Sequence, residues 1–70
     1  MSKNKKIAFT DREKQIIELL AKGYKYTDIS KKLFLGYSTV TSIVSNIVKK
    51  TESNNMVNAI FNIYYYKLMD

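Results

Sequence analysis

The apolar residues between positions 38 and 50 recur with the period of an α-helix. Positions i, i+3, i+4, i+7 and i+8 are all branched aliphatic residues: Val40, Ile43, Val44, Ile47 and Val48. Most positions between them are polar: Thr41, Ser42, Ser45, Asn46 and Lys49. A β-strand would mix both classes on each of its faces, whereas a helix separates them. The sequence therefore predicts an amphipathic helix over residues 38–50, and any fold of this chain must bury one side of it.

Another helix is predicted to begin after Thr10. The spacing Thr10-x-x-Glu13 ahead of an apolar run is typical of a capping box, in which the two side chains satisfy free backbone amides. We therefore interpret Arg12 and Glu13 as a structural pair or cap. Apolar residues follow at helical spacing: Ile16, Ile17, Leu19 and Leu20. Gly23 is well placed to end this helix in a left-handed conformation.

A short helix is predicted between these two, over residues 27–34. Thr27 is a candidate N-cap, and the Asp28 carboxylate lies favourably near the positive end of the helix dipole. Gly36 then interrupts the pattern and leaves room for a turn of three or four residues. Two helices joined by such a turn predict a helix-turn-helix, whose second helix enters the major groove of DNA.

The C-terminal segment predicts a fourth helix, over residues 56–69, that is apolar on most of its circumference. Its one narrow polar strip consists of Asn55, Asn58 and Asn62. Because a small core cannot cover so apolar a helix, we expect part of it to meet a second copy of the chain. The candidate interface residues are Met56, Ile60, Ile63, Tyr64 and Lys67. Tyr64, Tyr65 and Tyr66 point about 100° apart on a helix, so they favour core and dimer contact over base stacking.

Composition narrows the class of protein. The 70 residues suffice for one small all-α domain, predicted over residues 9–70 and preceded by a flexible basic arm over residues 1–8. Twelve Lys and Arg against six Asp and Glu give a net charge of +6, which suits a polyanion. The chain has no Cys or His, so we expect no enzyme, metal site or cofactor. With no membrane-spanning run and no signal-peptide core, the expected location is the cytoplasm.

The polar side of the 38–50 helix is the candidate DNA-reading surface. Hydroxyl and amide side chains can donate to or accept from base edges, and a Thr methyl can contact a thymine methyl. The predicted base-reading residues are Thr41, Ser42, Ser45 and Asn46. The alternative is an ordinary solvated face, which would usually carry more Glu and Lys. No charge lies between Gly36 and Val48, so attraction to phosphates is left to the arm and to Lys31, Lys32, Lys49 and Lys50.

An ordered set of short segments resembles the LuxR/GerE-type helix-turn-helix domain over about residues 9–61. The segments are Phe9-Thr10-Asp11-Arg12-Glu13, Leu19-Leu20-Ala21-Lys22-Gly23, Asp28-Ile29-Ser30, Leu33, Leu35, Thr39-Val40, Asn46-Ile47 and Ala59-Ile60. The resemblance implies four helices, transcription control in bacteria, recognition by the 38–50 helix and dimerisation through the last helix. It places Thr39 near a phosphate. Because Met1 lies eight residues before the motif, we expect a stand-alone member without a sensor module.

The likeness and the residue pattern together name candidates for contact with the DNA backbone: Tyr26, Thr27, Ser38, Thr39, Lys49 and Lys50. A Tyr hydroxyl before the 27–34 helix either reaches a phosphate or packs partly in the core. Four positions depart from the family pattern: Gly36 replaces the usual Ser, Thr41 the usual Lys, Ile43 a common His and Met56 the usual Arg. The operator sequence therefore does not follow from the resemblance.

Two functions remain in competition on the sequence. The favoured one is a dimeric regulator that binds specific double-stranded DNA, located on the nucleoid in the cytoplasm. The other is a protein-interaction module that pairs through its last helix with a larger regulator or with RNA polymerase and acts as an antagonist or accessory. The uncharged 38–50 helix and the apolar last helix motivate this second hypothesis.

Overall fold

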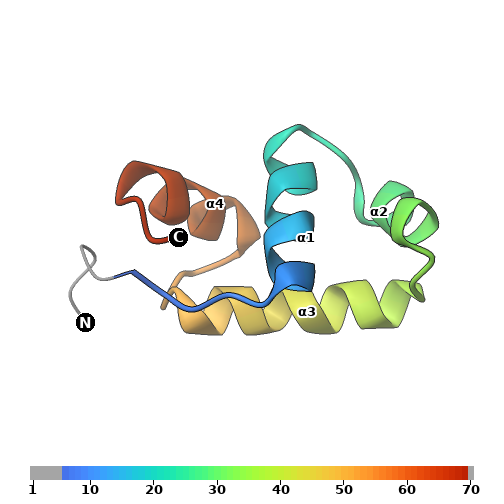
Figure 1. Ribbon diagram of the computed structural model, residues 1–70, viewed down its shortest axis with the longest axis horizontal. Helices are drawn as coiled ribbons and strands as arrows, with labels where there is room; N and C mark the ends of the chain where they lie inside the picture. Colours follow the sequence, from blue (N-terminus) through green and yellow to red (C-terminus); the bar gives the residue numbers. More distant parts are fainter. Residues whose placement is uncertain (1–5, 70) are drawn as a thin grey trace.

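The computed structural model describes residues 6–69 and contains four helices in that range. Figure 1 shows α3 lying along one side of the molecule with α1 standing across its middle. Helix α2 packs at the N-terminal end of α3, and α4 packs at its C-terminal end. In the described part of the chain, α1 and α3 each contact every other helix, whereas α2 and α4 do not contact each other. The predicted all-α, four-helix fold is confirmed.

Helix α1 (Asp11–Ala21) begins and ends where its sequence signals predict. The Glu13 amide donates to Thr10 Oγ1 at 3.1 Å, and the Thr10 amide donates to Glu13 Oε1 at 2.8 Å. These reciprocal bonds are the predicted capping box. After the helix, Gly23 has φ +98°, a conformation that glycine adopts without steric cost.

Helix α2 (Tyr26–Leu33) begins one residue before the predicted start, so its cap differs from the prediction. Lys25 is the N-cap residue, and its amide donates to Asp28 Oδ2 at 3.3 Å. Thr27 lies inside the first turn, so its prediction as N-cap is wrong. The Asp28 carboxylate supplies the bond because it is the residue three positions after the cap.

Helix α3 (Tyr37–Lys50) is the longest element, with 14 residues. The domain core forms where its inner face meets the other three helices. The buried apolar residues of this core are Phe9, Ile16, Ile17, Ile29, Val40, Val44, Ile47, Met56, Ala59 and Ile63. They come from all four helices and the segment before α1, so the chain described here has one shared core.

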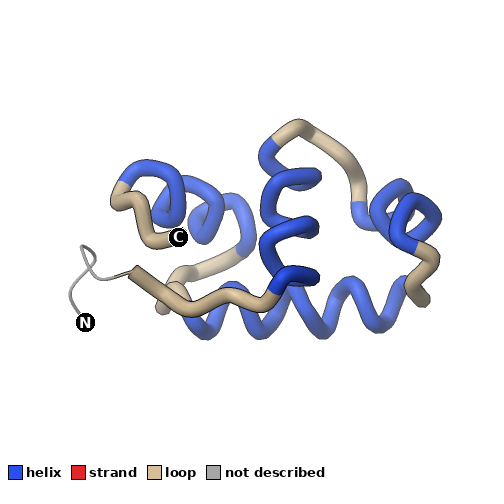
Figure 2. The backbone as a smooth tube through the Cα atoms, viewed as in Figure 1, coloured by secondary structure: helices blue, strands red, loops and turns tan. Residues whose placement is uncertain are grey.

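Helix α4 (Met56–Tyr65) is four residues shorter than the predicted 56–69 helix. The backbone leaves the helix after Tyr65, and Lys67 adopts a left-handed φ of +53°. This bend turns the chain back so that Leu68 becomes fully buried. Figure 2 shows the resulting non-helical segment next to α4. Burial of Leu68 ends the helix earlier than local periodicity predicts.

The segment before α1 pairs with the segment after α4. The Ile7 amide donates to the Leu68 carbonyl at 2.7 Å, and Ile7 forms a parallel β-bridge with Met69. Residues 6–8, predicted as part of a flexible arm, are therefore held against the domain. Residues 1–5 of that predicted arm, with Lys3 and Lys5, lie outside the described residues. Within residues 6–69, no helix is both long and apolar enough to cross a membrane.

Candidate nucleic-acid interface

A three-residue turn fixes the angle between α2 and α3. Phe34 closes α2 in a left-handed conformation with φ 56°. The Leu35 amide donates to the Ser30 carbonyl at 3.0 Å, and the Ser30 hydroxyl donates to the Leu35 carbonyl. Gly36 is the N-cap of α3 and provides no side-chain bond to its first turn. The predicted helix-turn-helix connection around Gly36 is thus present.

The inner side of α3 consists of the apolar residues that the periodicity identifies. Val40, Val44 and Ile47 are buried in the core, and Ile43 and Val48 are half-buried beside it. This burial fixes the rotation of the helix about its axis because turning it would expose these side chains to water. The rotation in turn decides which polar residues face outward.

The outer side of α3 is a continuous polar stripe. Its exposed members are Ser38, Thr39, Ser42, Ser45, Asn46 and Lys49. They stand three or four residues apart, so they line one side of the helix over nearly its whole length. We call these residues, together with Thr41 at their edge, the α3 stripe. Seven of the predicted DNA contacts therefore belong to the α3 stripe, six of them exposed and Thr41 half-buried at its edge.

Thr41 differs from the other members because its hydroxyl already has a partner. It is half-buried, and its Oγ1 donates to the Ser38 carbonyl at 2.9 Å. The hydroxyl proton is thereby used, but the oxygen lone pairs and the methyl group are not. Within residues 6–69, the side chains of Ser42, Ser45 and Asn46 make no hydrogen bonds of this kind. They are therefore open to an external partner.

The predicted backbone contacts on α2 lie beside the first turn of α3. The Tyr26 and Tyr37 rings are 6.3 Å apart in a tilted arrangement. Tyr26 is half-buried and packs against the core, whereas Thr27 is exposed. The ring of Tyr26 thus packs partly in the core, as one alternative predicts, and its contact with a phosphate stays a prediction.

Lys50 is part of the fold rather than a free cation. Its ammonium donates to Glu13 Oε1 at 2.7 Å and to the Ala8 carbonyl at 3.2 Å. It also lies 5.6 Å from the centre of the Phe9 ring. This ammonium already joins α1, α3 and the segment before α1, and the phosphate contact predicted for Lys50 stays a prediction. Lys49 next to it is exposed.

The ion pair changes the acidity of Glu13. Burial of this carboxyl raises its pKa, but hydrogen bonds from Lys50 and from Thr10, together with attraction to the Lys50 charge, outweigh that effect. The pKa of Glu13 therefore lies below its ordinary value. Sequence reasoning found the Thr10 bond but missed Lys50, which lies 37 residues away along the chain.

The exposed side of α4 differs from the predicted dimer interface. Met56 and Ile63 are buried in the monomer core, which leaves them little surface for the dimer contact predicted for them. Asn62, predicted in a polar strip, is 2% exposed and donates to Ser53 Oγ at 2.9 Å. The exposed apolar residues of this helix are Val57, Phe61, Tyr64 and Tyr65. Helical spacing, with Val57, Phe61 and Tyr65 four residues apart, could have identified this side.

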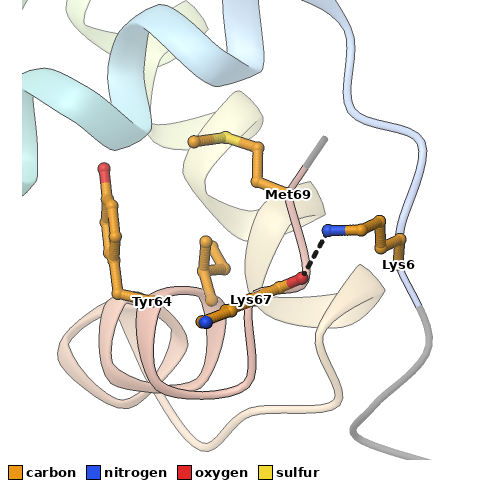
Figure 3. A pocket seen from close by; sticks show the side chains of 5 residues that line it. Lys6, Tyr64, Lys67 and Met69 are labelled. Atoms are coloured by element: carbon orange, nitrogen blue, oxygen red, sulfur yellow. Dashed lines mark hydrogen bonds between the residues drawn. The ribbon is translucent and has the colours of Figure 1, made fainter.

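A shallow hollow lies where the two ends of the described chain meet, next to the exposed side of α4. Its volume is about 290 Å³, and it is lined by Lys6, Ile63, Tyr64, Lys67 and Met69. Figure 3 shows Lys6 reaching across to the C-terminal segment, where its ammonium donates to the Lys67 carbonyl at 3.2 Å. Ile60, half-buried, lines a separate hollow with Val57. The three predicted interface residues that keep exposed surface are therefore Ile60, Tyr64 and Lys67.

Comparison with known protein families identifies the family to which this four-helix domain belongs. The model of the GerE family, described as bacterial regulatory proteins of the luxR family, matches residues 7–62. The chain belongs to the luxR family. The match includes all of α1, α2 and α3 and most of α4, so the α3 stripe lies within it. This luxR-family domain is of the DNA-binding, transcription-regulating type.

Two relatives of known name illustrate the likeness. The chain is 39% identical over 51 residues to the transcriptional regulatory protein DesR of Bacillus subtilis, covering 73% of this chain and 26% of DesR. It is 33% identical over 60 residues to the response regulator protein VraR of Staphylococcus aureus, covering 86% of this chain and 29% of VraR. The chain thus matches less than a third of the length of these relatives.

Proposed function

We propose that this luxR-family domain binds specific sequences of duplex DNA by placing α3 in the major groove. The observation that carries this proposal is the α3 stripe, a row of exposed hydroxyl and amide groups on a helix whose other side is buried. Such groups hydrogen-bond to base edges, and the major groove is wide enough to admit one helix. Because the core fixes α3, the stripe would be presented with little ordering cost.

The exposed lysines next to the helix-turn-helix supply attraction to phosphates in this proposal. Lys49 lies at the C-terminal end of the stripe, and Lys31 and Lys32 lie in the last turn of α2. Ser38, Thr39, Thr27 and Tyr26 are proposed to contact the backbone around the N-terminal half of α3. Phosphate contacts position the helix, whereas the stripe reads the bases.

A twofold dimer formed through α4 completes the proposed binding unit. Phe61 and Tyr65 stack at 5.0 Å between ring centres on the exposed side of that helix, and Val57 extends the same apolar row. Ile60, Tyr64 and Lys67 border this row. A symmetric pair would bury it against its own copy, and the two α3 helices would then face major grooves about one DNA turn apart, roughly 10 bp.

Binding to random-sequence duplex pools over a salt series tests this function. For about five neutralised phosphates, the logarithm of the binding constant should fall with the logarithm of salt concentration with a slope near −4 to −5. The Ser42→Ala, Ser45→Ala double variant should lose sequence enrichment while keeping the salt slope. Asn54→Ala, an exposed loop variant, is the control. Salt-independent or absent binding would refute the proposal.

A second candidate function is favoured by the exposed row on α4. Val57 is 82% exposed, Tyr65 67% and Phe61 55%, which is unusual for apolar side chains of this size. Under this alternative the row binds a larger transcription regulator or RNA polymerase instead of a second copy. Sedimentation of the wild type and of the Phe61→Lys variant distinguishes dimerisation through α4 from binding of another protein. If α4 forms a dimer, the variant should be monomeric and should bind DNA more weakly than the wild type.

A further inference from the structure

The residue types of the α3 stripe limit which base pairs it can recognise. This inference rests on the proposed function, since it concerns the specificity of the same surface. Between Tyr37 and Val48 the helix has no Arg, Lys, Asp or Glu. The single Arg of the chain, Arg12, lies on α1, where it donates to Gln15 Oε1 at 3.2 Å. The stripe therefore reads bases with neutral groups alone until Lys49.

The missing side chains are those that single out a G·C pair. In the major groove, guanine presents two acceptors that Arg or Lys contacts in a bidentate manner, and the cytosine amino group is matched by Asp or Glu. Adenine instead presents one acceptor and one donor, which suit the amide of Asn, and thymine presents a methyl group. Apart from Lys49, the stripe has one Asn, two Thr and three Ser: Asn46, Thr39, Thr41, Ser38, Ser42 and Ser45.

We propose that α3 selects half-sites whose centre consists of A·T base pairs. Asn46 is exposed, and its amide has no partner within residues 6–69, so both of its polar ends can pair with adenine. The Thr41 hydroxyl donates its hydrogen bond to the Ser38 carbonyl, so towards DNA it offers an acceptor for the adenine amino group and a methyl for thymine. Ser42 and Ser45 lie between them and bond to either base.

Lys49 marks the limit of this neutral surface. It is exposed in the last turn of α3, next to Lys50, whose ammonium is held by Glu13. We assign Lys49 to a phosphate and not to guanine, because it lies in the last turn of α3, beyond the neutral side chains that are proposed to read the bases. Lys49→Ala should therefore weaken binding to all sequences alike and reduce the salt slope by about 1.

Selection from a random duplex pool with the full chain, followed by base replacement in the enriched site, tests the proposal. Central A·T pairs are replaced by inosine·cytosine pairs, which present the pattern of G·C in the major groove and lack the guanine amino group in the minor groove. We expect at least a fivefold loss of affinity, since one good bidentate contact discriminates by about 1–3 kcal/mol. Replacing thymine with uracil should cost roughly fourfold per contacted methyl.

Asn46→Ala serves as the matched protein variant. It should narrow the difference in affinity between the A·T site and the inosine·cytosine site, leaving only the part that comes from thymine methyl contacts, while circular dichroism shows an unchanged fold. Enrichment of G·C centres would overturn this inference and leave the proposed function standing. Retained affinity for the inosine·cytosine site would also overturn it, because the A·T preference would then come from the minor groove. Absence of any duplex binding would refute the proposed function itself.

Discussion

The two ends of α3 are held in different ways. At the C-terminal end, Lys50 pairs with Glu13 of α1, and the following residues bond to α4. At the N-terminal end, Gly36 provides no side-chain cap, and the preceding Phe34 is 95% exposed in a left-handed conformation. The same helix is thus anchored at one end by side-chain bonds and at the other mainly by apolar packing and the turn.

A chain of polar bonds explains the firmness of the C-terminal end. Asn62 donates to Ser53 Oγ, which lies 2.6 Å from Thr51 Oγ1, and Thr51 donates to the Ile47 carbonyl at 2.9 Å. Asn62 and Thr51 are both buried, so losing one bond would leave a buried group without a partner. This arrangement shows that α4 and α3 are joined by specific polar bonds, whereas the N-terminal end of α3 is held by the turn and by apolar contacts. Four substitutions can break or sharpen this contrast.

Removing the buried amide of Asn62 should have the largest effect. Asn62→Ala leaves Ser53 Oγ without its donor and opens a small space between α3 and α4, so we expect a loss of about 2 kcal/mol in the free energy of unfolding. Urea unfolding followed by circular dichroism measures this loss. Asn46→Ala on the α3 stripe is the control and should change stability by less than about 0.5 kcal/mol. Equal losses of stability in the two variants would contradict the proposed role of the Asn62–Ser53 bond in holding α4 against α3.

Neutralising Glu13 should weaken the same end to a smaller extent. Glu13→Gln keeps an oxygen for the Thr10 amide but removes the charge that holds Lys50, so we expect a loss of about 1 kcal/mol near neutral pH. Because the folded pKa of Glu13 is lowered, its stabilisation is present above the unfolded pKa and disappears as pH falls through the folded pKa. Wild type and variant should therefore converge in acid, as unfolding curves over a pH series can show.

The exposed Glu18 on α1 provides the matched control for this change. Glu18→Gln should leave both the stability and its pH dependence near those of the wild type. A difference between wild type and Glu13→Gln that persists unchanged in acid would contradict the assigned role of the ion pair.

Replacing Phe34, in the turn before the N-terminal end of α3, should stabilise the protein. Its side chain loses almost no burial when removed, and glycine adopts φ 56° without the steric cost that a Cβ imposes. Phe34→Gly should therefore raise the free energy of unfolding by roughly 0.5–1 kcal/mol. Gly23→Ala is the opposite control, since φ +98° strains any Cβ even in open space. A lower free energy of unfolding for Phe34→Gly would contradict this reasoning, because it would mean that the Phe34 ring makes stabilising contacts.

Adding a cap at Gly36 should have the smallest effect. A Cβ there would lie 3.7 Å from Thr39 Oγ1, an ordinary contact, and the backbone already has the extended conformation of an N-cap. Gly36→Ser should raise stability by only a few tenths of a kcal/mol. Hydrogen exchange of the first-turn amides of α3 should slow in this variant, while those near Lys50 stay unchanged. Unaltered exchange at the first turn would mean that this end is already held.

The accuracy of the sequence predictions depends on how local each feature is. The capping box at Thr10, the left-handed Gly23 and the inner residues of α3 are confirmed because each depends on neighbours within one or two turns. The predicted length of α4 is wrong because burial of Leu68 ends the helix. For the α3 stripe, sequence gives the residue types and their spacing, and the DNA contacts stay predictions.

The sequence by itself determined that four helices form, which side of α3 turns inward and which polar residues of α3 lie on its other side, since a helical period needs no distant partner. Only the tertiary structure decided which backbone and side-chain groups that are remote in the chain come into contact. Lys50 is held by Glu13, Ile7 pairs with Leu68, and Ile63 is buried in the core. The residue type shows which contacts a group can make. Only folding brings the partner within reach and removes the water that competes with it.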